Sequence, residues 1–324
     1  MRIPILRATV LMLLLPAASF SQDTGSGATP QDDITTFRKN VNIVNVFFTV
    51  KGQHDSLIAN LPKEEFEVFE NGKPQTIKYF SVESNQPLTL GLLIDSSGSM
   101  ERMLPTEKVV ASDFVRQVIS QKDLAFVMSF DIRADLLQDL TSDVRLLRSG
   151  LDRAHINIGG GSGGIPGLGQ GPIPISNPKG TVLFDGVYLA ADEILSKQVG
   201  RKAMVILTDG EDEGSTLKLR DAIEAAQKAD AVCYILLISD PQYVSNPRDM
   251  HQLAEQTGGR MIVINRADKI GDAFTQIANE LRSEYYIGYS SDNDKRDGTF
   301  RKIEVKSKSG HKIQARKGYY APAS

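Results

Sequence analysis

The chain has 324 residues, of which 41% are apolar, and a formal net charge of −3 from 37 basic and 40 acidic residues. This length permits one large hydrophobic core and a second, smaller one. The nearly balanced charge excludes the strongly basic footprint that nucleic-acid binding requires. The single cysteine, Cys233, permits no internal disulfide, and its apolar neighbours predict a buried, unreactive thiol.

Residues 1–21 have the pattern of a secretory signal peptide. Arg2 and Arg7 accompany a short apolar stretch, and Ser19 and Ser21 are small residues at the positions that precede a cleavage site. An uncleaved membrane anchor is the alternative, although the apolar stretch is shorter than the roughly 20 residues that span a bilayer. We therefore expect a secreted, periplasmic or cell-envelope protein with no integral membrane span in the mature chain.

Two flanks of the chain have the alternating pattern of β-strands. Residues 22–37 are polar and predict a flexible linker, whereas residues 38–88 are rich in β-branched and aromatic residues and contain Asn71-Gly72, a strong hairpin signal. Residues 283–324 alternate as well, and predict strands over Tyr285–Ser291, Phe300–Lys308 and His311–Pro322. Each flank is short for a domain of its own, so we expect them to pair into one small antiparallel β domain. Two separate β appendages are the alternative.

Residues 89–282, between the flanks, alternate buried strands with amphipathic helices. The strands are continuous apolar runs, which is typical of strands covered on both faces. Strands are expected at Leu88–Asp95, Leu124–Phe130, Ala203–Thr208, Ala231–Ile238 and in "TGGRMIVI". Helices are expected at 142–154, with Ser142 as a candidate cap, at 216–229, 248–257 and 268–283, and where apolar residues follow helical spacing within 110–119 and 187–195. This order predicts an α/β fold with a doubly wound, mostly parallel, Rossmann-like sheet and helices on both faces.

A segment rich in glycine and proline, residues 157–180, interrupts this pattern. Its composition cannot bury enough apolar surface to order itself. It is either a tolerated surface insertion or a loop that shapes a binding face. It does not match a phosphate-binding loop, so we do not expect nucleotide binding there.

The stretch "DSSGS" ends the apolar run Leu88–Ile94. Alternate residues of an extended segment point the same way, so the side chains of Asp95, Ser97 and Ser99 would converge at the carboxyl end of a central strand. Ligands bind at that edge in doubly wound sheets. Oxygen ligands indicate a hard cation, Mg²⁺ first, then Ca²⁺ or Mn²⁺. A simple turn or helix cap is the alternative for these residues.

Two further oxygen-bearing residues lie at matching positions, Thr181 in "GTVLFDGV" and Asp209 in "ILTDGED". In this order the three motifs resemble the metal-ion-dependent adhesion site (MIDAS) of von Willebrand factor type A (VWA) domains, and all five positions match. The resemblance implies that Ser97 and Ser99 bind the metal directly, and Thr181 directly or through water. It implies that Asp95 and Asp209 act mainly through water and hydrogen bonds. The β flanks and "RKGYYAP" are similar to secreted bacterial VWA-related proteins.

Neutral hydroxyl ligands leave most of the charge on a bound cation, so an Asp or Glu carboxylate of a protein partner could complete its shell. We therefore expect divalent-metal-dependent protein binding, of the kind used in cell adhesion, and no enzyme activity. A metal-stabilised structural envelope component and a metal-dependent hydrolase are the alternatives. Against catalysis, "DSSGS" lacks the GxSxG pattern, and His54, His155, His251 and His311 are scattered.

Other carboxylates near these motifs are expected to be solvated and to take no part in metal binding. Asp131, in "SFDIRAD", is typical of a solvated loop, and so are Glu211, Asp212 and Glu213 in the acidic stretch "DGEDEG" at 209–214. The alternative for the acidic stretch is that its excess charge shifts the metal preference toward Ca²⁺ or discourages acidic partners.

Overall fold

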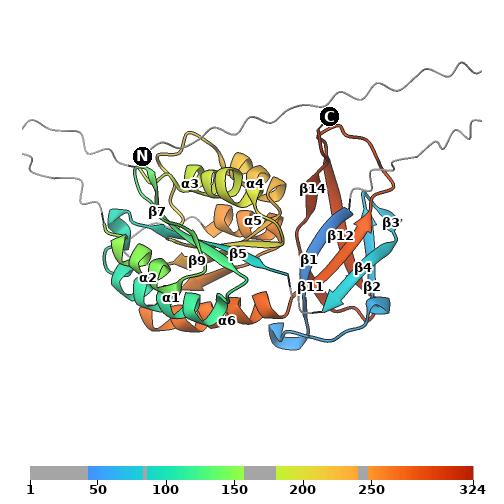
Figure 1. The fold of residues 1–324 in the computed structure, drawn as a ribbon, viewed down its shortest axis with the longest axis horizontal. Coiled ribbons are helices and arrows are strands. Elements are labelled where there is room, and N and C mark those ends of the chain that lie inside the picture. Colours follow the sequence, from blue (N-terminus) through green and yellow to red (C-terminus); the bar gives the residue numbers. More distant parts are fainter. Residues whose placement is uncertain (1–42, 83–85, 157–179, 240–246, 324) are drawn as a thin grey trace, which may run out of the picture. The chain divides into compact units, whose positions relative to one another are not determined.

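The computed structural model describes residues 43–82, 86–156, 180–239 and 247–323 (Figure 1). The predicted signal peptide (1–21), the linker (22–37) and all but the last residue of the glycine-rich segment lie outside the described residues. Within the described ranges, no helix is both long enough and apolar enough to cross a lipid bilayer.

A six-stranded sheet forms the centre of the α/β part. Its strands are β5 (Leu88–Asp95), β6 (Leu124–Phe130), β7 (Ala134–Thr141), β8 (Arg201–Thr208), β9 (Ala231–Ile238) and β10 (Met261–Ile264). The strand order is β10-β9-β8-β5-β6-β7, and all neighbours are parallel except β6 and β7. The prediction of a mostly parallel sheet is confirmed, and β7 is an antiparallel edge strand that the sequence pattern did not indicate.

Helices cover both faces of this sheet (Figure 1). They are α1 (Leu104–Val118), α2 (Val144–Arg153), α3 (Leu183–Leu189), α4 (Leu219–Lys228), α5 (Pro247–Thr257) and α6 (Ile270–Arg282). Helix α3 continues as a π-helical turn over Ala190–Ile194, and single 3₁₀ turns lie at Gln53–Asp55, Lys63–Glu65, Gly98–Met100, Leu195–Lys197 and Ala267–Lys269. The predicted Ser142 cap is wrong: Asp143 caps α2 by accepting a hydrogen bond from the backbone N–H of Arg145 at 2.8 Å.

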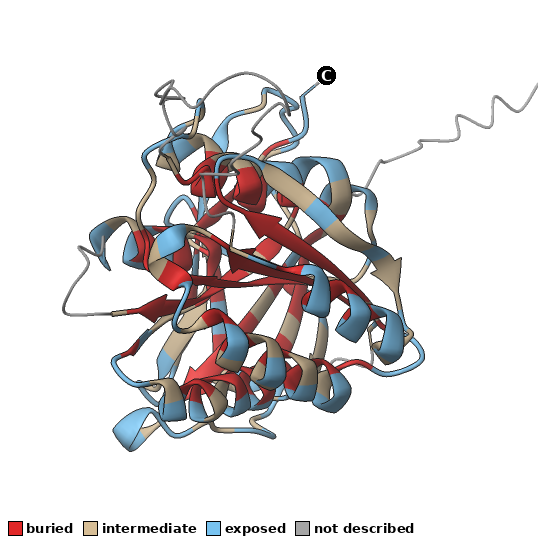
Figure 2. Ribbon diagram, turned by 90° about the vertical axis from the view of Figure 1, so that its left-hand side faces the viewer, coloured by how far each residue is buried: buried red, intermediate tan, exposed pale blue. Residues whose placement is uncertain are grey.

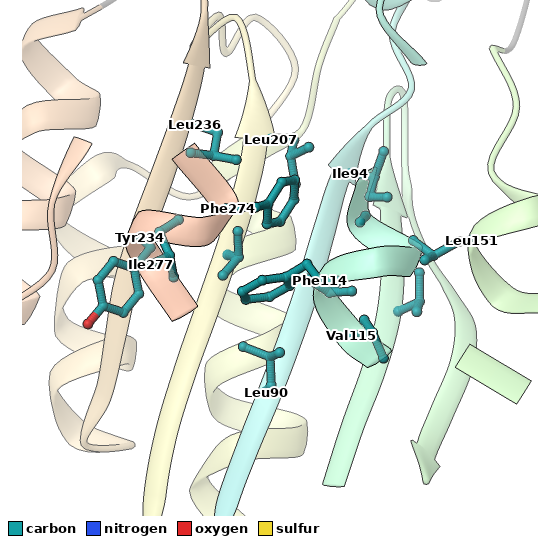
Figure 3. Close-up of a cluster of buried hydrophobic side chains, with 14 of the residues drawn as sticks. Leu90, Ile94, Phe114, Val115, Leu151, Leu207, Tyr234, Leu236, Phe274 and Ile277 are labelled. Carbon is teal, nitrogen blue, oxygen red and sulfur yellow. The ribbon is translucent and has the colours of Figure 1, made fainter. Parts of the chain in front are cut away.

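Successive residues of β5 belong to two separate hydrophobic cores. Leu90 and Ile94 pack with α1 and α6 on one face (Figure 3), whereas Leu93 packs with α3 and α4 on the other. In Figure 2 the central strands are buried along almost their whole length. Gly91 is required here, because a Cβ at that position would lie 2.5 Å from the Phe126 ring. Two covered faces explain why these strands are apolar without alternation.

The two flanks form an antiparallel β domain of two packed sheets, as predicted. The strands are β1 (Ile43–Lys51), β2 (Phe66–Glu70), β3 (Lys73–Gln75), β4 (Ile77–Val82), β11 (Tyr285–Ser290), β12 (Phe300–Ser307), β13 (Lys312–Ala315) and β14 (Gly318–Tyr320). The sheets have the orders β13-β1-β11-β4 and β14-β12-β2-β3, so each contains strands from both flanks. Phe48 of one sheet packs on Phe66 of the other, with ring centroids 5.0 Å apart.

Two details of the β domain test local sequence signals. Asn71 and Gly72 have positive φ angles of 49° and 79° and join β2 to β3, so the predicted hairpin is confirmed. The single strand expected over His311–Pro322 is wrong, because β13 and β14 lie in different sheets. The chain crosses between the sheets at Arg316 and Lys317, and this crossing is a tertiary feature with no local sequence signal.

A buried ion cluster joins the β domain to the α/β part. Glu280 of α6 is buried and lies 3.3 Å from Lys51 Nζ of β1 and 2.5 Å from a guanidinium nitrogen of Arg260. Since buried charges require partners, this cluster constrains the two parts of the molecule to one another.

Candidate metal site

Asp95 is the last residue of β5, and its carboxylate is held by hydrogen bonds from two strand ends. It is 0% exposed. Its Oδ1 accepts from the backbone N–H of Ser97 at 2.9 Å, and its Oδ2 accepts from the hydroxyl of Thr208, at the end of β8, at 2.7 Å. Burial raises the pKa of Asp95 to about 7, and the neighbouring charge of Asp209 adds to this, while the bonds from Ser97 and Thr208 oppose it. The sequence analysis did not single out Thr208, which orients this carboxylate.

Ser97 and Ser99 bring their hydroxyl groups together, as the spacing predicts. The two Oγ atoms lie 3.0 Å apart, directly after the carboxyl end of β5. Ser97 occupies the N-cap position of the 3₁₀ turn Gly98–Met100, but its side chain makes no capping bond. A helix-capping role therefore does not account for the Ser97 hydroxyl, which remains a candidate metal ligand.

Asp209 follows β8, the strand next to β5. It is 4% exposed, and its Oδ1 accepts from the backbone N–H of Glu211 at 3.1 Å. Its Oδ2 is buried and has no hydrogen-bond partner among the described residues. A buried carboxylate oxygen without a partner is unfavourable, so this atom is a candidate for binding an absent group.

Thr181 is held between the loops that follow β6 and β8. Its carbonyl accepts from the backbone N–H of Gly214 at 3.1 Å, and the next N–H, of Val182, donates to the carbonyl of Asp131 at 2.6 Å. Gly180 has a φ of +147°, and a Cβ on it would lie 2.9 Å from the Cα of Gly214. This close approach of two backbones places Thr181 beside the loop that begins with Asp209.

Two carboxylates that we expected to be solvated are structural. Asp131 is buried, and its Oδ1 accepts from the backbone N–H of Arg133 at 3.1 Å. Asp212 accepts from the backbone N–H of Phe184 at 3.2 Å and from the hydroxyl of Ser215 at 2.5 Å. Both therefore shape the loops around the site. The solvated-loop expectation is wrong for the buried Asp131, whereas Asp212 is half-buried.

Glu107 is a buried acid near the site that the sequence analysis missed. It lies in the first turn of α1, and neither carboxylate oxygen has a hydrogen-bond partner among the described residues. Burial raises its pKa well above the usual range, and the charges of Asp95 and Asp209 raise it further. The helical periodicity contained the signal, because Glu107 falls on the same face as the core residues Leu104 and Ala111.

The arrangement fits a cation with oxygen ligands. Ser97 and Ser99 supply adjacent hydroxyls, and Asp209 supplies a buried oxygen that has no partner within the described ranges. The Asp95 carboxylate accepts hydrogen bonds from Ser97 and Thr208. In the part of the chain that the structure describes, no three His, Cys, Asp or Glu side chains gather as a metal-binding group. The five-residue set differs from such groups, because only two of its members are carboxylates.

The comparisons with known proteins bear on the fold. No model of a protein family matches the chain, and no curated protein matches it. A solved von Willebrand factor type A structure from Catenulispora acidiphila is similar, with 12% sequence identity, a TM-score of 0.50, and coverage of 89% of this chain and 76% of that chain. The chain has a VWA-like fold.

Two other solved structures are similar at lower TM-scores. The conserved hypothetical protein BatB from Bacteroides thetaiotaomicron has 16% identity and a TM-score of 0.47, covering 60% of this chain and 97% of that chain. An aerotolerance-related membrane protein from Bacteroides fragilis has 16% identity and a TM-score of 0.43, covering 60% of this chain and 99% of that chain.

Proposed function

We propose that this protein uses a bound divalent cation to bind a protein partner. Mg²⁺ is the first candidate, then Ca²⁺ or Mn²⁺, because the donors are all oxygen atoms. The proposed set is Asp95, Ser97, Ser99, Thr181 and Asp209. One observation carries the proposal: the Ser97 and Ser99 hydroxyls lie 3.0 Å apart at the carboxyl edge of the sheet, beside the strand that precedes Asp209, whose Oδ2 has no hydrogen-bond partner among the described residues.

The donor chemistry favours binding over catalysis. A cation held by neutral hydroxyls supplies a concentrated positive charge, which an Asp or Glu carboxylate of a partner would neutralise. The Asp95 carboxylate already accepts hydrogen bonds from the Ser97 backbone N–H and the Thr208 hydroxyl. It therefore orients the loop and is not free to act as a general base. The signal-peptide pattern in residues 1–21 supports a secreted or envelope-associated location.

The direct test is a calorimetric titration of Mg²⁺, then Ca²⁺, into chelator-treated protein. We expect saturable binding by the wild type that is lost in Ser97→Ala and in Asp209→Ala. The matched control is Glu213→Ala, an exposed acid of the same loop, which should bind like the wild type. Absence of binding by the wild type, or equal binding by all three variants, would overturn the proposed site.

The metal-dependent binding of a protein partner is tested in a second experiment. Immobilised protein should retain an envelope protein in Mg²⁺ and release it in chelator, and Ser97→Ala should retain nothing. A metal that only stabilises the fold predicts a different result. In that case chelation would lower the unfolding temperature and leave the set of retained proteins unchanged.

A further inference from the structure

We infer that Glu107 is a positioning residue of the proposed metal site, whose carboxylate accepts hydrogen bonds from water bound to the cation. This inference rests on the proposed function and adds a sixth residue to its site. Glu107 comes from helix α1, whereas the other five residues come from a strand end, from loops or from the 3₁₀ turn that contains Ser99. Its carboxylate would therefore approach the water around the cation from helix α1.

The first observation is the burial of Glu107 without a partner. The residue is 0% exposed, and neither Oε1 nor Oε2 has a hydrogen-bond partner among the described residues. Its neighbours on the same helix face are Leu104, Ala111 and Phe114, which belong to the hydrophobic core. Buried polar groups are nearly always hydrogen-bonded, so a carboxylate with two unpartnered oxygens indicates an absent ligand or water.

The second observation is the position of Glu107 relative to the other acids. Helix α1 begins four residues after Met100, the end of the 3₁₀ turn that contains Ser99. The charges that act on Glu107 are those of Asp95 at the end of β5 and Asp209 after β8. All three side chains are buried, and a divalent ion at the carboxyl ends of β5 and β8 would compensate their charge.

Glu107 would act through water, because other residues are already proposed as the direct ligands of the cation. Ser97, Ser99 and Thr181 are the residues proposed to reach the cation, and a Mg²⁺ ion usually keeps several waters. Outer residues that hydrogen-bond such waters orient the site, and their loss typically weakens metal binding by about 10- to 100-fold. The first turn of a helix also favours a negative charge, which suits a carboxylate in this place.

The test uses two variants of the whole protein and two measurements. Glu107→Met removes both acceptor oxygens at similar length and keeps a good helix former, whereas Glu107→Gln keeps one acceptor without the charge. Mg²⁺ affinity is measured by calorimetry, and the unfolding temperature is measured in chelator. Glu101→Gln, an exposed acid of the preceding turn, is the matched control.

We expect Glu107→Met to weaken Mg²⁺ binding by about 10- to 100-fold and Glu107→Gln to weaken it less. In chelator, both variants should unfold at the wild-type temperature or above it, because an unpartnered buried acid has been removed. Weaker Mg²⁺ binding without a loss of stability in chelator would identify Glu107 as a positioning residue. If Glu107 had only a structural role, its replacement would lower the unfolding temperature in chelator.

Mg²⁺ affinity within twofold of the wild type in both variants would overturn the inference while leaving the proposed function intact. If Glu107→Met does not fold, the affinity of Glu107→Gln decides in the same way. Failure of the wild type to bind Mg²⁺ would instead refute the proposed function itself, and this inference with it.

Discussion

Replacing Asp95 by Asn should stabilise the metal-free protein at neutral pH even though it removes a proposed metal residue. The structure explains why the side chain can be exchanged. The Asn oxygen can accept from the Ser97 backbone N–H, and its amide can donate to the Thr208 hydroxyl. That hydroxyl can still accept from the backbone N–H of Gly210. The variant therefore keeps the bond from Ser97, reverses the bond to Thr208 so that the hydroxyl hydrogen must turn to another acceptor, and loses the buried charge.

The magnitude follows from the pKa of Asp95, which is raised from 3.8 to about 7. The folded state then holds the proton more tightly than the unfolded state. The stabilising contribution is fully present below pH 3.8 and is lost as the pH rises through 7. Each tenfold difference in proton affinity between the two states corresponds to about 1.4 kcal/mol, so the total loss is about 4 kcal/mol. Between pH 5 and pH 8 the advantage of Asp95→Asn over the wild type should grow by about 2.5 kcal/mol.

The assay is urea denaturation of both proteins in chelator at pH 5, 6, 7 and 8. Asp113→Asn, a change of an exposed acid on α1, is the control and should show no such pH dependence. A difference between Asp95→Asn and the wild type that does not change with pH would refute the reasoning, because it would mean that Asp95 is not a buried acid with a raised pKa.

Two further predictions concern packing and buried charge. Replacing Gly91 by Ala should lower the free energy of unfolding by about 1–3 kcal/mol, because the new Cβ would lie 2.5 Å from the Phe126 ring. Denaturation should show this loss, and a second change, Phe126→Leu, should recover part of it; a neutral Gly91→Ala would contradict the close approach. Replacing Glu280 by Gln should cost about 3–5 kcal/mol, because buried Lys51 and half-buried Arg260 lose their shared partner. Thermal unfolding would measure this, and Lys51→Met in the same chain should restore stability in part; if it restores none, the Lys51–Glu280 pair is not a source of the loss.

The sequence alone determined the parts of this protein that depend on neighbouring residues. Strands β6 and β9 have the predicted bounds, because an uninterrupted apolar run between turn signals describes a strand covered on both faces. The hairpin at Asn71-Gly72 depends on the backbone conformations that these two residues tolerate. The convergence of Ser97 and Ser99 follows in the same way from strand geometry.

Only the tertiary structure decided which distant groups meet. The edge strand β7, and the crossing of the chain between sheets after β13, depend on pairings with strands far away in sequence. The burial of Asp131 depends on the loop that carries Val182, and the lack of a partner for Glu107 among the described residues depends on the packing of α1 against the sheet. A local pattern specifies an element and its faces, but whether a carboxylate is solvated, paired or left facing a site depends on what packs against it, and that is a property of the whole fold.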